Sequence, residues 1–250
     1  MSKLEFCPIC HDRGVIIRGE AAVPCRCRRQ RALANRFRDS GLPAGLCEHK
    51  FEQFNFEYYD HLKTGGASGE PTGFELARRT FQAARDFANN FPGNPHQDGL
   101  LISGPVGSGK TFLAACVANF LLQAGYAVLF AVVPDLLDRL RATYDPGRQD
   151  TAYREQDIMD AAREAPLLVL DDLGAHNYTD WTRNRIYSIL NYRLNHRLPV
   201  IITTNINLED LEACLGERTT SRICQMCWSC RLAVHMDIRV IQRREKLKYN

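Results

Sequence analysis

The chain has 250 residues, of which 45% are hydrophobic and 24% are charged, and its formal net charge is +3. This composition is typical of a globular protein that buries a sizeable core, and it excludes a disordered or fibrous chain. The sequence contains no long apolar run and no export signal, so we expect no membrane span and a cytoplasmic location. Ten cysteines in such a chain favour reduced thiols or a metal site over disulfides.

The first 40 residues differ in composition from the rest of the chain. Residues 1–39 carry nine Lys or Arg against four Asp or Glu, a local charge of +5. Such a charge fits nucleic acid or an acidic partner, and a solvated basic helix is an equally good interpretation. We interpret residues 1–40 as an accessory module.

Four cysteines of this module have the spacing of a metal site. Cys7, Cys10, Cys25 and Cys27 supply four thiolates, enough for a tetrahedral Zn²⁺ ion that stabilises a module too small for a core of its own. The second pair is separated by one residue, so His11 is an alternative to one of its thiolates. The other interpretation is a disordered arm with free thiols.

The remainder of the chain alternates between apolar runs and helical spacing. Residues 41–73, with an aromatic segment and a cluster of Gly, Ser, Thr and Pro, are predicted to be a linker. Within the main domain, residues 74–250, strands are expected over 99–103, 127–132, 166–170 and 199–203. Helices are expected over 74–91, 110–124, 134–144, 153–164 and 181–196. This alternation predicts an α/β fold in which helices cover both faces of a parallel sheet.

A phosphate-binding motif lies between the first of these strands and the helix that follows it. Residues 104–111 satisfy G-x-x-x-x-G-K-[ST], the P-loop pattern. In this pattern glycines let backbone N–H groups surround the phosphates, the lysine neutralises them and the threonine hydroxyl holds Mg²⁺. The residues predicted to contact the nucleotide are Gly104, Pro105, Val106, Gly107, Ser108, Gly109, Lys110, Thr111 and Phe112.

Polar side chains follow two later strands of the predicted sheet. Asp171 and Asp172 end an apolar strand, and Asn205 follows the next strand along the chain. Asp171 is the predicted Mg²⁺ carboxylate, and Asp172 the group that orients or deprotonates the attacking water. The alternatives are that Asp172 is the N-cap of the next element, and that the polar residues up to Asn205 form a turn.

The order of these motifs resembles the AAA+ helicase loaders of the DnaC/DnaI type, with IstB-like transposition ATPases as relatives. The likeness is carried by residues 99–111, 133–137, 171–174, 203–205 and 216–222, and covers about residues 50–240. The cysteines of residues 1–40 are similar to the front end of DnaI-like loaders, which IstB-like proteins generally lack.

This resemblance implies a P-loop AAA+ ATPase that uses ATP and Mg²⁺, with slow turnover stimulated by a partner. It implies that Asn205 senses the γ-phosphate and that Arg222, or else Arg218, is an arginine finger acting on a neighbouring subunit. The expected partners are a replicative DNA helicase, single-stranded DNA and further copies of the chain. Without the resemblance, Arg218 and Arg222 are an i, i+4 pair on a solvated helix face.

The sequence leaves two alternative functions possible, and it leaves the roles of two further motifs undecided. A transposition helper and an ATP-binding switch with little turnover are alternatives to the loader. Cys224, Cys227 and Cys230 are spaced like part of an iron–sulfur signature, although separate thiols are the favoured interpretation. Asp237 and Arg239 resemble a closing D-x-R pattern of the family to which no role is assigned. Basic residues that would attract the DNA backbone are Arg231, Arg239, Arg243, Arg244, Lys246 and Lys248, in addition to the Arg-rich front.

Overall fold

In the computed structural model of the chain, the described residues form a parallel sheet between two layers of helices. They are residue 7 and residues 9–11, 13–18, 21–25, 40–61, 71–143, 155–174 and 178–248. The sheet has the order β4-β5-β6-β3-β7, and every pairing in it is parallel. Its strands are β3 (Gly99–Ser103), β4 (Val128–Val132), β5 (Leu167–Asp171), β6 (Val200–Thr204) and β7 (Cys227–Arg231).

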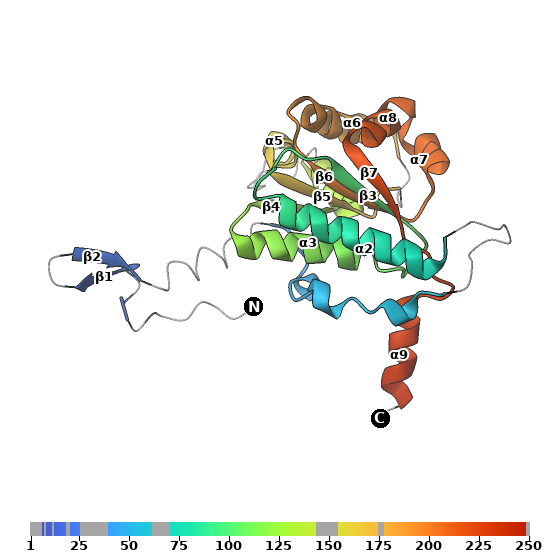
Figure 1. Ribbon diagram of the computed structural model, residues 1–250. Helices are drawn as coiled ribbons and strands as arrows, with labels where there is room; N and C mark the ends of the chain where they lie inside the picture. The colour runs from blue at the N-terminus through green and yellow to red at the C-terminus, as the bar shows by residue number, and fades with distance from the viewer. Residues whose placement is uncertain are drawn as a thin grey trace.

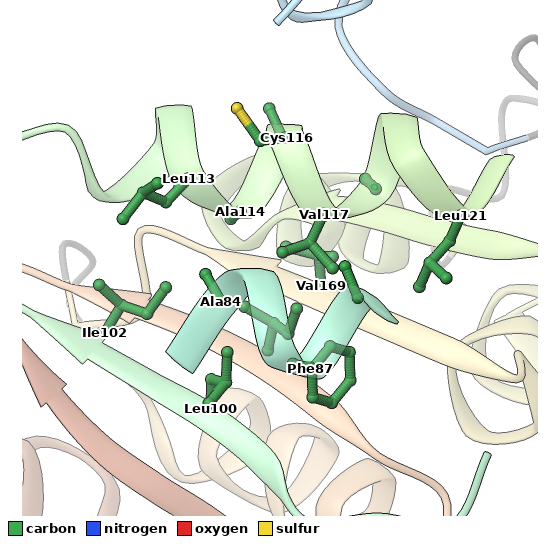
Figure 2. Close-up of a cluster of buried hydrophobic side chains, with 14 of the residues drawn as sticks. Ala84, Phe87, Leu100, Ile102, Leu113, Ala114, Cys116, Val117, Leu121 and Val169 are labelled. Carbon is green, nitrogen blue, oxygen red and sulfur yellow. The ribbon is translucent and has the colours of Figure 1, made fainter. Parts of the chain in front are cut away.

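Helices cover both faces of this sheet (Figure 1). The helices α2 (Gly73–Asn90) and α3 (Lys110–Ala124) pack on one face, where side chains such as Phe87, Leu113 and Val117 form a core with β3 and β5 (Figure 2). A second core on the other face is formed by α4 (Val133–Ala142), α5 (Glu155–Glu164), α6 (Asp180–Asn195), α7 (Leu208–Leu215) and α8 (Glu217–Met226). A final helix, α9 (Ile238–Lys248), projects from the body of the domain.

The positions of the two helices nearest the P-loop are explained by residues at or near their ends. Thr72 and Glu75 form a capping box that satisfies the first N–H groups of α2. In α3 every residue from Leu113 to Asn119 is buried, so its sequence is apolar all round instead of amphipathic. Glycines with positive φ flank α3 at Gly109 and Gly125, which explains why the helix begins and ends there.

The predicted strands and helices of the main domain agree with the observed bounds to within about two residues wherever both are described. The sequence did not predict β7, α7 or α9, and it indicated α8 only as the helix that carries Arg218 and Arg222. β7 was missed because each of its residues is half-buried or exposed and it contains no apolar run, as expected for an edge strand. The antiparallel hairpin of β1 (Val15–Arg18) and β2 (Ala21–Pro24) was not predicted either.

Residues 40–61 pack on the core of the main domain, whereas the sequence suggested a linker over 41–73. They contain three short 3₁₀ helices, Ala44–Leu46, Phe51–Gln53 and Phe56–Tyr58. Phe51 and Tyr59 are buried in the same core as α3. Burial of these aromatic side chains is the physical reason that the segment belongs to the domain, since each one removes a large apolar area from water.

None of the helices in the described ranges is long and apolar enough to cross a membrane.

Candidate functional site

The P-loop lies at the carboxyl end of β3 and leads directly into α3, as the sequence predicted. Gly104 has φ 153° and Gly107 has φ 72°, conformations that residues with a side chain rarely adopt. A Cβ atom at Gly107 would lie 2.0 Å from the carboxylate of Asp237, so a side chain at this position would displace Asp237. The loop is also tied to the sheet, because the Gly104 N–H donates to the Thr204 carbonyl oxygen at 3.2 Å.

The Lys110 side chain turns back into the loop that precedes it. Its Nζ donates to the carbonyl oxygens of Gly104 and Pro105, each at 2.8 Å. Burial lowers the pKa of Lys110, while the nearby carboxylates of Asp172 and Asp171 oppose that shift. The ammonium group therefore lies in the centre of the loop, where it faces any anion held by the loop's N–H groups.

Asp171 joins the P-loop to the neighbouring strands. Its Oδ1 accepts hydrogen bonds from the hydroxyls of Thr111, at 2.8 Å, and Thr203, at 2.6 Å. Burial raises the pKa of Asp171, and these two hydrogen bonds act in the opposite direction. Thr111 and Asp171 are 60 positions apart in the chain but meet because the carboxyl ends of parallel strands share one edge of the sheet.

Asp172 occupies a turn with a left-handed backbone, φ 63°, and is half-buried. Its N–H donates to the hydroxyl of Thr203 at 2.9 Å. It does not cap the next helix, since α6 has Thr179 as its N-cap. The N-cap alternative for Asp172 is therefore wrong, and its carboxylate is left on the P-loop side of the sheet, where it acts on Lys110.

Two buried polar atoms near the loop have no hydrogen-bond partner within the described residues. They are Oδ1 of Asn205, just after β6, and Oγ of Ser108 in the P-loop. Buried polar atoms in folded proteins nearly always have a hydrogen-bond partner. Two such atoms without a partner beside a phosphate loop therefore indicate a place where a polar ligand or water binds. The amide of Asn205 can turn to present its NH₂ group to such a ligand.

A cavity of about 410 Å³ opens beside the P-loop. Residues 107–112 line one side, and the opposite sides come from two segments that the sequence analysis left without a role. One is the aromatic segment, with His49, Phe54 and Tyr58; the other is the start of α9, with Arg239. A mainly apolar cavity with aromatic lining residues next to a phosphate loop has the chemistry to hold a nucleobase.

The first segment is fixed to the P-loop by buried hydrogen bonds. The Tyr59 hydroxyl donates to the Ser108 carbonyl oxygen at 2.7 Å, and burial raises the pKa of this phenol. Asn119 of α3 donates to the carbonyl oxygens of Leu46, at 2.7 Å, and His49, at 2.9 Å. The aromatic wall is thus held in place by the helix that follows the P-loop.

The start of α9 closes the cavity from the other side. The Ile238 N–H donates to the Gly107 carbonyl oxygen at 3.1 Å. Arg239 donates to both carboxylate oxygens of Asp237, at 3.1 and 2.8 Å, and its positive charge contributes to lowering the pKa of Lys110. The structure therefore brings the D-x-R pattern to the phosphate loop, which the sequence did not establish.

Comparison with known proteins places this arrangement in a family. Residues 94–232, more than half of the chain, match the family described as IstB-like ATP binding protein. The chain is a member of the IstB-like ATP-binding proteins.

Two helicase loaders are similar to the chain. The chain is 29% identical over 133 residues to the "Replicative helicase loader DnaI" of Bacillus subtilis, and 29% identical over 140 residues to the "Replicative helicase loader DnaC" of Escherichia coli. These matches cover 53% and 56% of this chain but only 41% and 55% of the relatives, about half of their length.

A solved structure, "Crystal structure of the DnaC helicase loader", is 27% identical, with a TM-score of 0.59, and covers 77% of this chain and 99% of that one. The AMPPCP-bound DnaA of Aquifex aeolicus, at 19% identity and a TM-score of 0.57, shares the fold. The IstB-like chain thus has the AAA+ α/β fold that the sequence predicted, a parallel five-stranded sheet flanked by helices.

The two arginines proposed for a trans contact lie on α8 of this IstB-like fold, and neither lines the cavity beside the P-loop. Arg222 is half-buried; its Nε donates to Oδ1 of Asn191 at 2.7 Å, and its guanidinium lies 5.5 Å from the ring centre of Tyr187. Arg218 is exposed. Arg222 is therefore anchored on α6 of its own chain.

The N-terminal cysteines come together in part. The Sγ atoms of Cys7, Cys10 and Cys25 all lie within 4.8 Å of one another, and those of Cys7 and Cys25 are 3.9 Å apart. Two thiolates on one tetrahedral zinc ion, at about 2.3 Å each, are separated by about 3.8 Å, so this set fits the ion. Cys27, the fourth predicted ligand, lies outside the described residues.

The C-terminal cysteines are not brought together. Cys227 and Cys230 pack in different cores, on opposite faces of the sheet, and Cys224 is exposed on α8. Within the described ranges the only clustered cysteines are those of the N-terminal hairpin region. The iron–sulfur interpretation of residues 224–230 is wrong, because the strand geometry of β7 turns the cysteines apart.

Proposed function

We propose that this protein binds ATP with its triphosphate in the P-loop and its base in the cavity beside Tyr58. The observation that carries this proposal is the hydrogen bond between Thr111 and Asp171, which joins the loop to a strand-end carboxylate next to Lys110. The unpaired atoms of Asn205 and Ser108 support it, since a γ-phosphate or an ordered water beside it would satisfy them.

Magnesium fits the same place. The hydroxyl of Thr111 and the carboxylate of Asp171 are oxygen donors of the kind that Mg²⁺ prefers, and they lie beside the phosphate loop. The bound ion would neutralise the charge of the phosphate oxygens. Thr203, by donating to the same carboxylate oxygen, fixes how Asp171 is oriented toward it.

We further propose slow hydrolysis by residues at the same sheet edge. Asp172 would orient the attacking water and accept its proton, and Asn205 would hold that water or the γ-phosphate. Lys110 would stabilise the charge that develops on the phosphate oxygens. Arg222 lies on α8 and does not line the cavity of its own chain, so in this proposal it would act on the ATP of a neighbouring copy.

The contribution of Arg222 can be separated from its structural contacts. We expect Arg222→Ala to bind ATP normally but to lower turnover of the assembled protein about tenfold or more, because an arginine finger stabilises transition-state charge. Asn191→Ala is the matched control: it removes the anchor seen at 2.7 Å and leaves the guanidinium present. An equal loss of turnover in both variants would mean that the contact between α6 and α8 is structural only.

At the level of the cell, we propose that the protein is a loader that delivers a hexameric replicative helicase to single-stranded DNA. The replicative helicase loaders DnaI and DnaC, to which the chain is similar, support this proposal. Basic side chains on α9, including Arg243 and Lys246, would attract the DNA backbone without reading bases. The N-terminal module would contact the helicase.

The decisive experiment is a loading assay with purified components. The protein, the replicative helicase of the same organism and circular single-stranded DNA are mixed with ATP and magnesium. We expect ATP-dependent recovery of the helicase on the DNA, and none with Lys110→Ala. Absence of any complex between the protein and the helicase would contradict the loader proposal.

A second candidate is a helper of DNA transposition, favoured by the match to the IstB-like family. It predicts ATP-dependent binding to duplex DNA and a complex with a transposase instead of a helicase. Pull-down with each purified partner separates the two candidates, because only one of them should be retained in the presence of ATP.

We propose that the N-terminal thiols hold zinc, with Cys27 or His11 as a further ligand to Cys7, Cys10 and Cys25. The separation of the thiols supports a tetrahedral ion. Metal analysis of the purified protein should find about one zinc per chain. The zinc should be lost from a Cys7→Ser, Cys10→Ser variant and retained in Cys214→Ser, and a native preparation without metal would overturn the assignment.

A further inference from the structure

The strand β7 ends the sheet and has a free outer edge. Its one strand partner among the described residues is β3. The Leu232 N–H, just after the strand, donates to the Ser103 carbonyl oxygen, so alternate residues face β3 and those between them face outward. Because of this alternation, the N–H and C=O groups of Ser229 and Arg231 point away from the sheet. The Arg231 carbonyl oxygen accepts a hydrogen bond from the hydroxyl of Thr80 at 2.8 Å.

The backbone groups of Ser229 have no hydrogen bond to any other part of the described chain. A row of unpaired N–H and C=O groups at a sheet edge is a template for another strand. The helix α2 packs against β7. The edge is thus open at its centre and bounded by α2 near its end.

An exposed aromatic residue stands on the same strand. The side chain of Trp228 is 68% exposed, the highest value among the large hydrophobic residues that the structure describes. It lines a groove of about 510 Å³ between α2 and β7, with Ala83, Phe87 and Leu100 on its apolar wall. This groove shares no residue with the cavity beside the P-loop. A solvent-exposed tryptophan beside an apolar groove is typical of a protein interface.

The groove carries opposite charges at its two ends. Arg231 is the last residue of β7, and Arg79 lies next to Thr80, which contacts the Arg231 carbonyl oxygen. At the other end, Asp98 precedes Gly99, which pairs with Cys227 at the start of β7. All four of the lining charges, Arg79, Arg231, Asp86 and Asp98, are exposed.

The positions of the acids follow from the neighbouring contacts. The side-chain amide of Gln97 donates to the Phe87 carbonyl oxygen at 2.8 Å, which places Asp98 near the end of α2 that carries Asp86. The cationic and anionic ends are separated by the length of β7, about 13 Å for four steps of a strand. An occupant of the groove must therefore carry an acid and a base about four residues apart.

We propose that the groove binds an extended segment of a partner protein, which adds to β7 as an antiparallel strand. Its N-terminal end carries an acidic side chain opposite Arg79 and Arg231, and its C-terminal end carries a basic side chain opposite Asp86 and Asp98. Between them, apolar side chains lie on the face of the strand that Trp228 occupies. Antiparallel addition gives the stronger ladder, and the open backbone of Ser229 supplies its hydrogen bonds. This interaction does not depend on the nucleotide site.

A defined peptide tests the proposal. The probe is fluorescein-labelled Glu-Val-Thr-Val-Lys-amide, and the control is the charge-swapped peptide Lys-Val-Thr-Val-Glu-amide. Fluorescence anisotropy should show that the full-length protein binds the probe about tenfold more tightly than the control, as two complementary charge pairs allow. Equal affinity for both peptides, or tighter binding of the control, would overturn the proposal.

Two sets of variants locate the binding. Ser229→Pro removes the N–H group that points outward and leaves the hydrogen bonds to β3 in place. This variant should no longer bind the probe, whereas Ser229→Ala, which keeps the N–H group, should still bind it. The double variant Arg79→Glu, Asp98→Lys leaves one cation and one anion at each end of the groove and should therefore remove the preference between the two peptides, which decides the question even if the proline variant unfolds. Unchanged binding by Ser229→Pro, an unchanged peptide preference in the double variant, or self-association of the chain that Ser229→Pro abolishes would refute a partner segment at β7.

Discussion

The two halves of the proposed nucleotide site are built in different ways. The phosphate half comes from one continuous stretch, residues 104–111, supported by the ends of β5 and β6. The base half comes from two segments, residues 46–59 and the start of α9, which are nearly 180 positions apart. A phosphate loop needs closely spaced backbone N–H groups, which only neighbouring residues provide. A base needs only flat apolar walls, which any part of the chain can supply.

This difference has a consequence for mutation. The phosphate half depends on individual side chains with charges and on backbone conformation, so one change should remove most of the affinity. The base half depends on contact area shared among several aromatic and apolar groups, so each change should cost less.

Lys110→Ala should lower the affinity for ATP at least about a hundredfold, because it removes charged hydrogen bonds to phosphate worth about 1.5–3 kcal/mol each. Titration with a fluorescent ATP analogue in the presence of magnesium measures this effect. Arg85→Ala, which removes one exposed charge from α2, is the control and should bind normally. ATP affinity unchanged in Lys110→Ala would refute the assignment of the phosphate half.

Tyr58→Ala should weaken ATP binding about tenfold, since stacking of a base on an aromatic ring contributes about 1–3 kcal/mol. Tyr58→Phe keeps the ring and should bind normally. Competition with inorganic tripolyphosphate sharpens the comparison: its affinity should be the same in wild type and Tyr58→Ala, because it occupies only the phosphate half. Equal weakening of ATP and tripolyphosphate would mean that the two halves are not separate.

Asp171→Asn should abolish hydrolysis yet raise the melting temperature by roughly 2–4 °C at neutral pH. Burial raises the pKa of Asp171, so the folded state holds this proton more tightly than the unfolded state does. Wild-type stability therefore falls as the pH rises from the ordinary pKa of an aspartate through the raised value, and remains lower above it. The Asp171→Asn variant does not lose stability in this way, and its side-chain oxygen still accepts hydrogen bonds from the hydroxyls of Thr111 and Thr203.

The measurement is thermal unfolding of both proteins between pH 3 and pH 8. The difference between their melting temperatures should increase with rising pH and then stay constant. The less buried Asp172→Asn is the control and should show a smaller gap. A variant that is less stable than wild type at pH 8 would show that the two threonine hydrogen bonds outweigh the burial of the charge.

Prediction from sequence succeeded where the signal was local. The P-loop pattern and the four apolar strands are found as expected, and Thr111 and Asp171, which were both predicted to hold Mg²⁺, lie within hydrogen-bond distance of each other. It failed where tertiary contacts decide. β7 carries no apolar run because one edge faces solvent, and the aromatic segment around Phe54 looked like a linker because its burial depends on α3.

The helix with Arg218 and Arg222 shows the same limit at a single residue. The sequence placed the pair at i, i+4 and gave no reason from the residues alone to treat them differently. In the structure Arg222 is anchored by Asn191 of α6 while Arg218 faces solvent. Nothing within ten residues of Arg222 in the chain could have indicated a partner 31 positions away.

By itself, the sequence determined the layered α/β fold and the phosphate-binding loop, because apolar periodicity and glycine conformation act between residues close in the chain. Only the tertiary structure decided the aromatic wall of the cavity, the contact of Asp237 and Arg239 with the loop, and the open edge of β7. Those features depend on which distant surfaces exclude water together, a property that no local stretch of residues encodes.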